Sequence, residues 1–190
     1  MAQAHSCLPF VEEIALCTPS LWSDIRITKL DYKWASKMLQ RSQQNTLTAH
    51  VNFDDLSRRT RRCASIDRAF TMLADNVGRC RDLSLYNVEP EPFGRFLTPN
   101  HNASQLLVLQ LSVGCPFFGV DEDNQFILSD RNLRADALKH LTLIACPLDW
   151  NSTFLHRLTH LKIASASNTH SEALNFLRVL PQVTSLCQPA

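Results

Sequence analysis

The segment Leu138-Lys-His-Leu141-Thr-Leu143-Ile-Ala-Cys146-Pro-Leu148 places its apolar residues in a fixed order. One apolar residue is followed by two variable positions, a second apolar residue, one variable position and a third apolar residue. The alternation from Leu141 to Leu143 is typical of a short strand with one face in a core. Because one such unit cannot bury its apolar face alone, we expect further copies beside it.

Further copies of this pattern occur on both sides of the segment. Upstream copies span residues 80–85 and 106–111, and downstream copies span residues 158–163 and, in truncated form, 183–186. Residues 22–27 and 47–53 also fit when the apolar class is relaxed. The middle apolar residues of the copies stand at positions 25, 51, 83, 109, 141, 161 and 186.

The spacing of these copies indicates leucine-rich repeats, whose strands recur every ~20–29 residues. Residues 138–148 fill every position of that template, including its Asn/Cys position at Cys146. Two gaps of 32 residues, which end at Leu83 and at Leu141, indicate longer connections. We therefore predict an α/β solenoid like that of leucine-rich repeats, with parallel strands on its concave face and helices on its convex face.

Segments with helical spacing lie between the predicted strands, as this architecture requires. A polar residue that can cap a helix opens the first two, and glycine or proline ends the last two. The predicted stripes are Trp34, Met38 and Leu39 after Asp31; Ile66, Phe70, Leu73 and Val77 between Ser65 and Gly78; and Ala173, Leu177 and Leu180 before Pro181.

Strand residues that point away from the core predict a concave binding face. Its mixture of acids, bases, histidines and an aromatic side chain favours a protein or peptide ligand over a phosphate backbone. A solvated sheet face is the simpler interpretation of any single residue, whereas the surface as a whole is the better candidate. We expect Tyr86, Arg26 and the histidines to be anchors. The predicted face comprises Asp24, Arg26, His50, Asn52, Asp82, Ser84, Tyr86, Gln110, Ser112, His140, Thr142, His160 and Lys162.

Composition weighs against several other classes of protein. The formal net charge of +1 provides no strong field toward nucleic acid or a membrane surface, and four glycines leave little material for a phosphate-binding loop. No run approaches the ~18 apolar residues of a membrane helix. The seven cysteines are odd in number and lack zinc-knuckle spacing, and no signal peptide is evident. We therefore predict an intracellular protein, cytoplasmic or nuclear, with no nucleic-acid or membrane partner.

Residue spacing suggests neither catalysis nor a cofactor. No Ser-His-Asp or Cys-His arrangement can be identified, so we predict a protein that is not an enzyme and has no catalytic, cofactor or metal site. His156 and His160 stand four residues apart and could share a metal on a helix, but the apolar pattern around them favours surface histidines. The basic residues 58–62 fit a solvated loop better than a nuclear-import or phosphate patch.

The stretch Ile14-Ala-Leu16-Cys-Thr-Pro19-Ser-Leu21-Trp22-Ser-Asp-Ile25 resembles the junction between the F-box and the repeats in fungal F-box/leucine-rich-repeat proteins. Residues 34–42 resemble the next helix of that family. The resemblance implies the substrate-recognition part of an SCF-type ubiquitin ligase, in which the repeats hold a protein client and the F-box holds a Skp-type adaptor. Catalysis would then belong to partner proteins.

The resemblance also implies a division of the chain. Residues 1–20 correspond to a remnant of the last F-box-like helix, about Cys7 to Cys17, with its linker. Residues 21–190 correspond to an irregular leucine-rich-repeat domain, which we expect to be truncated because no polar capping repeat follows the last predicted strand. The helices that dock on the adaptor have no counterpart in this sequence. A stand-alone repeat scaffold without a ligase connection is therefore the alternative.

Overall fold

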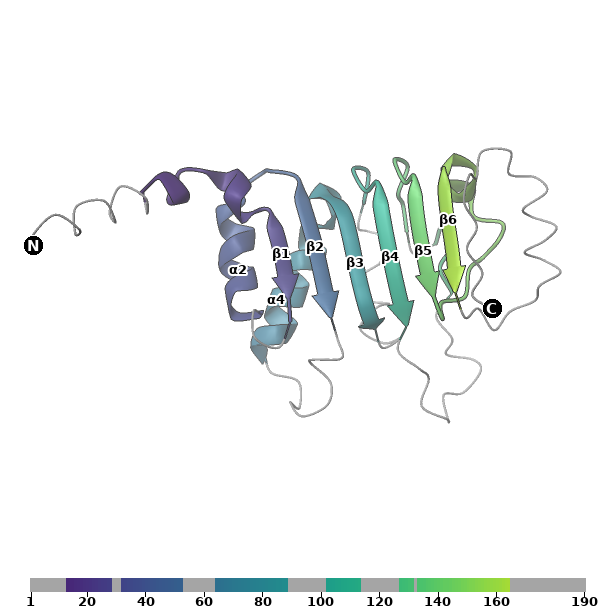
Figure 1. Cartoon of the computed structure of the whole chain (residues 1–190), viewed down its shortest axis with the longest axis horizontal. Helices are drawn as coiled ribbons and strands as arrows, with labels where there is room; N and C mark the ends of the chain where they lie inside the picture. Colours follow the sequence, from purple (N-terminus) through teal and green to yellow (C-terminus); the bar gives the residue numbers. More distant parts are fainter. Residues whose placement is uncertain are drawn as a thin grey trace, which may run out of the picture.

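A computed structural model describes residues 13–28, 32–52, 64–88, 102–113, 127–131 and 133–164. They form an α/β architecture around one six-stranded sheet (Figure 1). Among the described residues, no helix is long and apolar enough to cross a membrane. In chain order the elements are η1 (Pro19–Trp22), β1 (Asp24–Ile27), α2 (Tyr32–Arg41), β2 (Leu47–Asn52), α4 (Ala64–Asp75), η2 (Val77–Arg79), β3 (Cys80–Val88), β4 (Val108–Val113), β5 (His140–Ile144), η4 (Thr153–Arg157) and β6 (His160–Ala164).

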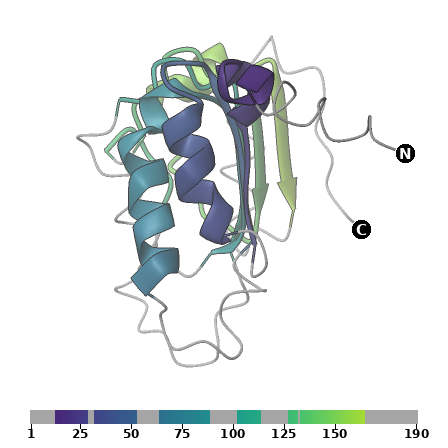
Figure 2. The ribbon, with the colours of Figure 1, turned by 90° about the vertical axis from the view of Figure 1, so that its left-hand side faces the viewer.

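The strands are parallel throughout and lie in the order in which they occur in the chain. This arrangement confirms the predicted parallel strands at residues 25–27, 83–85, 109–111, 141–143 and 161–163. Parallel neighbours need a crossover connection between them. Helices α2 and α4 supply two of these crossovers, and they lie side by side on one face of the sheet (Figure 2).

Two rows of apolar side chains run across all the strands and form the core beneath that face. All but Ile163, which is partly buried, are fully or almost fully buried. Burial of one such leucine, isoleucine or valine contributes ~1.5–3 kcal/mol. The first row is Ile25, Ala49, Leu83, Leu109, Leu141 and Leu161, and the second is Ile27, Val51, Leu85, Leu111, Leu143 and Ile163.

The register corrects the position of the second copy of the repeat. Ala49, not Val51, pairs with Ile25 and Leu83, so the predicted middle residue of this copy was wrong by two positions. Alanine is too small to stand out in an apolar pattern, whereas the neighbouring valine does. An error of two residues leaves every side chain on its predicted face, because side chains alternate with period two.

A recurring turn precedes each of the last four strands. The N–H of Cys80, Leu106, Leu138 or Leu158 donates to the carbonyl three residues earlier. In each turn, the residue whose carbonyl accepts and the residue whose N–H donates are both buried. These pairs are Val77 and Cys80, Ala103 and Leu106, Ala135 and Leu138, and Leu155 and Leu158. The chain therefore enters these strands in the same way four times, which is the structural counterpart of the sequence repeat.

Two of the predicted helices are present: α2 connects β1 to β2, and α4 lies between β2 and β3 in the chain. Residues 145–159, by contrast, connect β5 to β6 through turns and η4. A helix in the connection from β5 to β6 would also need a turn at each of its ends, and residues 145–159 leave little length for all three. The predicted stripe at residues 173–180 and the predicted strand at residues 183–186 lie outside the described residues.

Local details of the two helices differ in part from the predictions. The predicted stripe of α2 is confirmed for Leu39, which is buried, and for Met38, which packs against the core. Trp34 is 55% exposed, and its neighbour Ala35 faces the core instead. Helix α4 begins at Ala64, one residue before the predicted cap Ser65, and ends before Val77. Gly78 lies in η2, where a Cβ would come within 2.9 Å of the Asn102 carbonyl oxygen. Close approach to that backbone explains this glycine.

Candidate functional site

The predicted binding residues lie in rows on the face of the sheet opposite the apolar core. We call this surface the outer face. Each predicted residue alternates along its strand with the buried rows. The first two rows are in register from strand to strand, whereas in the third row the register shifts between β3 and β4, so Tyr86 and Ser112 are not paired. The first row holds Asp24, Asp82, His140 and His160; the second holds Arg26, His50, Ser84, Gln110, Thr142 and Lys162; the third holds Asn52, Tyr86 and Ser112.

The same rows contain residues that the sequence analysis missed. Thr48 stands between Asp24 and Asp82 in the first row, and Val108 pairs with His140 in that row. Ile144 follows Ser112 in the third row and is 36% exposed. Val108 and Ile144 were missed because an apolar pattern assigns valine and isoleucine to the core. Counting the alternation one step further along each strand could have found all three.

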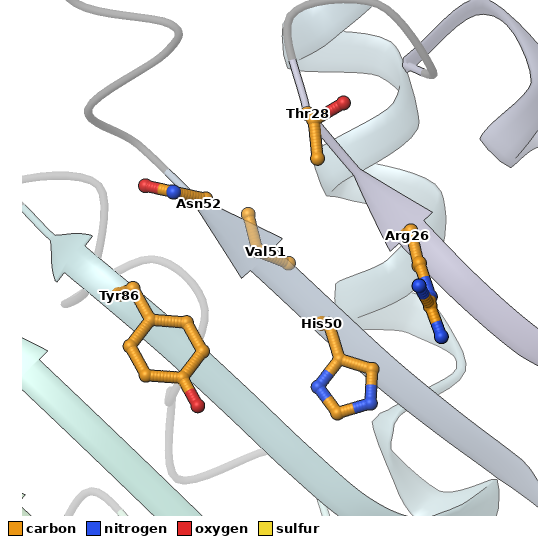
Figure 3. Close-up of a pocket in the computed structure, with 6 residues that line it drawn as sticks. All are labelled: Arg26, Thr28, His50, Val51, Asn52 and Tyr86. Atoms are coloured by element: carbon orange, nitrogen blue, oxygen red, sulfur yellow. The ribbon is translucent and has the colours of Figure 1, made fainter.

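An open hollow of about 350 Å³ lies at the β1–β3 end of the outer face. Arg26, His50 and Tyr86 reach it from three adjacent strands, as Figure 3 shows. Thr28, Asn52 and Val51 complete its lining. A guanidinium, an imidazole, an amide and a phenol thus surround one hollow, which suits an acidic or polar side chain of a partner.

Arg26 forms an exposed ion pair with Asp24 on the same strand. Its Nη2 atom lies 3.2 Å from Oδ2 of Asp24, and the two side chains are 65% and 55% exposed. Ion pairs between exposed side chains contribute only ~0–1 kcal/mol. Another carboxylate could therefore replace Asp24 at the guanidinium at little cost.

Tyr86 is held in place by a cross-strand network. Its hydroxyl donates to Gln110 Oε1 at 2.7 Å, and the hydroxyl of Ser84 donates to the same oxygen at 3.4 Å. On the neighbouring strands, Thr48 donates to Asp82 Oδ2 at 3.4 Å. The bond to Gln110 orients the ring of Tyr86, and preorganisation of this kind favours binding.

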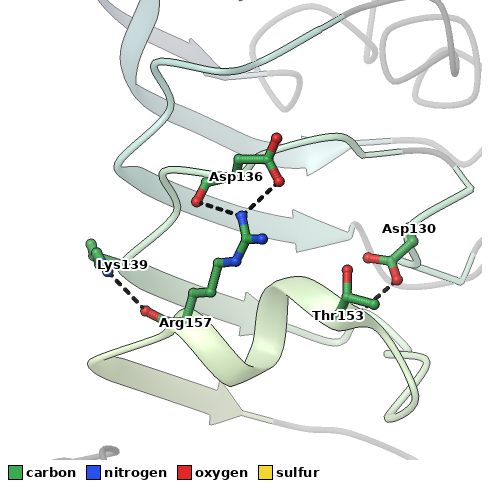
Figure 4. Close-up of polar contacts among 5 residues, drawn as sticks. All are labelled: Asp130, Asp136, Lys139, Thr153 and Arg157. Carbon is green, nitrogen blue, oxygen red and sulfur yellow. Dashed lines mark hydrogen bonds and ion pairs between the residues drawn. The ribbon is translucent and has the colours of Figure 1, made fainter.

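The β5–β6 end of the outer face has a different chemistry. The rings of His140 and His160 stack with centroids 4.3 Å apart and planes inclined by 32°. At the edge of the sheet, Arg157 donates to the carbonyl and the carboxylate of Asp136 (Figure 4). The N–H of Thr153 donates to Asp130 in the same region. These edge contacts tie the two strand-entry segments together.

His156 and His160 do not share a helix, because His156 lies in η4 and His160 lies in β6. Among the described residues, no group of three or more His, Cys, Asp or Glu side chains could hold a metal ion. The basic residues 58–62 lie outside the described residues.

Two buried cysteines lack the properties of a nucleophile. Burial raises the pKa of Cys80 and of Cys146 to about 12. A reactive cysteine needs the opposite shift, since the thiolate is the attacking species. Cys17, by contrast, is exposed.

We expect a thiol reagent at pH 8 to modify Cys17 in the folded protein and to leave Cys80 and Cys146 unmodified until the chain unfolds. Peptide mass spectrometry after a timed reaction with iodoacetamide, with and without urea, measures this. Equal labelling of all three thiols in the folded protein would contradict the burial of Cys80 and Cys146.

The same two thiols predict a pH dependence of stability. In the unfolded chain they ionise above their ordinary pKa of 9.0, whereas the folded chain keeps them protonated up to a pKa of about 12. The free energy of unfolding should therefore fall as the pH rises above 9.

Comparisons with protein-family models, with curated proteins and with solved structures found no match for this chain.

Proposed function

We propose that this chain is a leucine-rich-repeat-like solenoid that binds a protein client on its outer face, without catalysis of its own. We further propose that it serves as the substrate-recognition part of an F-box protein in an SCF-type ubiquitin ligase. The ligase connection rests on the resemblance of residues 14–25 and 34–42 to fungal F-box/leucine-rich-repeat proteins. The repeat assignment is supported by the sequential parallel strands and by the recurring turn.

The observation that carries the binding proposal is the in-register outer face with its hollow. Interfaces derive most of their affinity from a few anchors, among which Tyr and Arg are enriched. Tyr86 and Arg26 line the same hollow on β3 and β1. The first is oriented by Gln110, and the second can exchange Asp24 for a client carboxylate.

The test compares outer-face variants with matched variants on α2. Tyr86→Ala and Arg26→Glu alter the hollow, whereas Trp34→Ala and Lys37→Glu make the same kinds of change on an exposed surface of the helix. We expect the two outer-face variants to weaken client capture about 30-fold, since an anchor contributes ~2 kcal/mol or more. Isotope-labelled co-purification from cells, with circular dichroism to verify folding, measures the difference.

Two further readouts separate the ligase role from binding alone. For a ligase receptor, the Skp-type adaptor co-purifies with a form that carries a complete F-box ahead of residue 1. The half-life of the captured client also lengthens when Tyr86→Ala replaces the wild type. Client capture without an adaptor and without a change in half-life would favour the stand-alone scaffold. Identical capture by all four variants would contradict the outer-face proposal itself.

A further inference from the structure

We propose that His140 and His160 together bind a divalent transition metal ion on the outer face. They are register partners on the adjacent strands β5 and β6, so both side chains leave the sheet in the same direction. Both residues are exposed, and their ring centroids are 4.3 Å apart. The site does not depend on the proposed client, because its geometry comes from the sheet alone.

The separation of the two rings suits chelation. Metal–imidazole bonds of about 2.0–2.1 Å, at angles between square-planar and tetrahedral, place two ligand nitrogens about 2.8–3.4 Å apart. Rings with centroids at 4.3 Å and planes inclined by 32° can bring one pair of nitrogens to that separation through side-chain rotation. No movement of the backbone is required, since adjacent strands are already about 4.8 Å apart.

Thr159 contacts the ring of His160. Its hydroxyl donates to the Lys139 carbonyl at 3.2 Å and lies 3.0 Å from Nδ1 of His160. In the tautomer whose Nδ1 carries the proton, Nδ1 donates to this hydroxyl and the free lone pair lies on Nε2, where a metal ion can bind. Metal-binding histidines are oriented in this way by a hydrogen bond from the other ring nitrogen.

The surroundings predict which metals bind and how strongly. The row neighbour of His140 is Val108, and Thr142 and Lys162 follow two residues along the strands. These neighbours add no carboxylate, and the ammonium group of Lys162 opposes a cation. Two neutral imidazoles with water as the remaining ligands favour Ni²⁺, Cu²⁺ and Zn²⁺ over Mg²⁺ and Ca²⁺. We expect a dissociation constant in the micromolar range.

The test titrates the full chain with Ni²⁺ by calorimetry, in a buffer that keeps its thiols reduced. His140→Gln and His160→Gln should each weaken binding at least tenfold, and the double variant should bind no more weakly than either single one, because both ligands act together. His156→Gln, an exposed histidine outside the pair, is the matched control and should bind as the wild type does. Thr159→Val should weaken binding about tenfold.

A second readout depends on the fold. His140 and His160 lie far apart in the unfolded chain, so Ni²⁺ should raise the Tm of the wild type and of His156→Gln but not that of His140→Gln. All side chains that are changed are exposed or partly exposed, and their Tm without metal verifies that each variant folds. Equal Ni²⁺ affinity in the wild type, His140→Gln and His160→Gln would overturn the proposal, as would equal Tm shifts.

Discussion

Replacing Leu143 with alanine is expected to lower the free energy of unfolding by about 3 kcal/mol. Leu143 is fully buried on β5, in the apolar row between Leu111 and Ile163. The substitution removes three buried carbons and leaves a cavity between two strands that cannot move independently of the sheet. Since domains of this kind are stable by only ~5–15 kcal/mol, the loss would be a large part of the total.

Ile144 provides a matched control on the next residue of the same strand. It faces outward, is 36% exposed and is also a branched aliphatic side chain. Ile144→Ala should cost about 1 kcal/mol, well below the loss at Leu143, because about a third of its surface is already in water and no closed cavity forms. Urea unfolding followed by circular dichroism measures both variants. Similar losses for the two would mean that β5 does not have one face in the core and one in solvent.

The strands were predictable because their signal is local. Leu141 and Leu143 alternate with polar residues, and the recurring turn adds a buried residue three positions earlier. In β2 the local signal fails, because Ala49 occupies a core position that leucine or isoleucine occupies in other strands. The register of β2 is set by its neighbours rather than by its own composition.

The helices were less predictable because their faces depend on what covers them. Trp34 fits an apolar stripe by spacing alone, but the small residue Ala35 is the one that lies against the sheet. A tryptophan at that position would hold the helix away from the strands. Trp34 instead lies under the ammonium group of Lys37, 4.8 Å from its ring centroid.

The members of the outer face could be predicted, but their partners could not. Alternation along a strand places a residue on a face, whereas pairing across strands depends on the lengths of the connections between them. Tyr86 and Gln110 are 24 residues apart in the chain, yet they share a hydrogen bond. Spacing along the chain pairs His160 with His156, the nearer histidine, although the ring of His160 stacks on that of His140.

The role of Arg79 was not predicted from the sequence, although its side chain donates hydrogen bonds to Asn45, Asn76 and Ser42. Its guanidinium donates to the Asn45 carbonyl through Nε at 3.1 Å and through Nη2 at 2.8 Å. It also donates to Asn76 Oδ1 at 2.8 Å and to the buried Ser42 hydroxyl at 2.9 Å. Burial lowers the pKa of Arg79, with a smaller opposing effect from Cys80. The side chain thus joins the end of α2 to the segment that follows α4.

Arg79→Ala is expected to lower the free energy of unfolding by about 3 kcal/mol, because it leaves the carbonyls after α2 and the Ser42 hydroxyl without their donor. Hydrogen bonds to charged groups contribute ~1.5–3 kcal/mol each, and an unsatisfied buried partner adds its own cost. Arg79→Lys should recover only part of this loss, since an ammonium group cannot reproduce the planar fork that reaches Asn45 and Asn76. The neighbouring exposed Arg81, changed to alanine, is the control and should alter stability by less than about 0.5 kcal/mol.

A double-mutant cycle between Arg79→Ala and Ser42→Ala isolates the contact itself. Ser42 is fully buried, and its hydroxyl also donates to the Leu39 carbonyl at 2.8 Å. If Arg79 stabilises the fold through this hydroxyl, the double variant should lose about 1 kcal/mol less than the sum of the two single variants. Urea unfolding of all four proteins measures the coupling. Additive losses would mean that Arg79 acts through the Asn45 and Asn76 contacts, whereas a loss no larger than that of Arg81→Ala would contradict its role in joining the two segments.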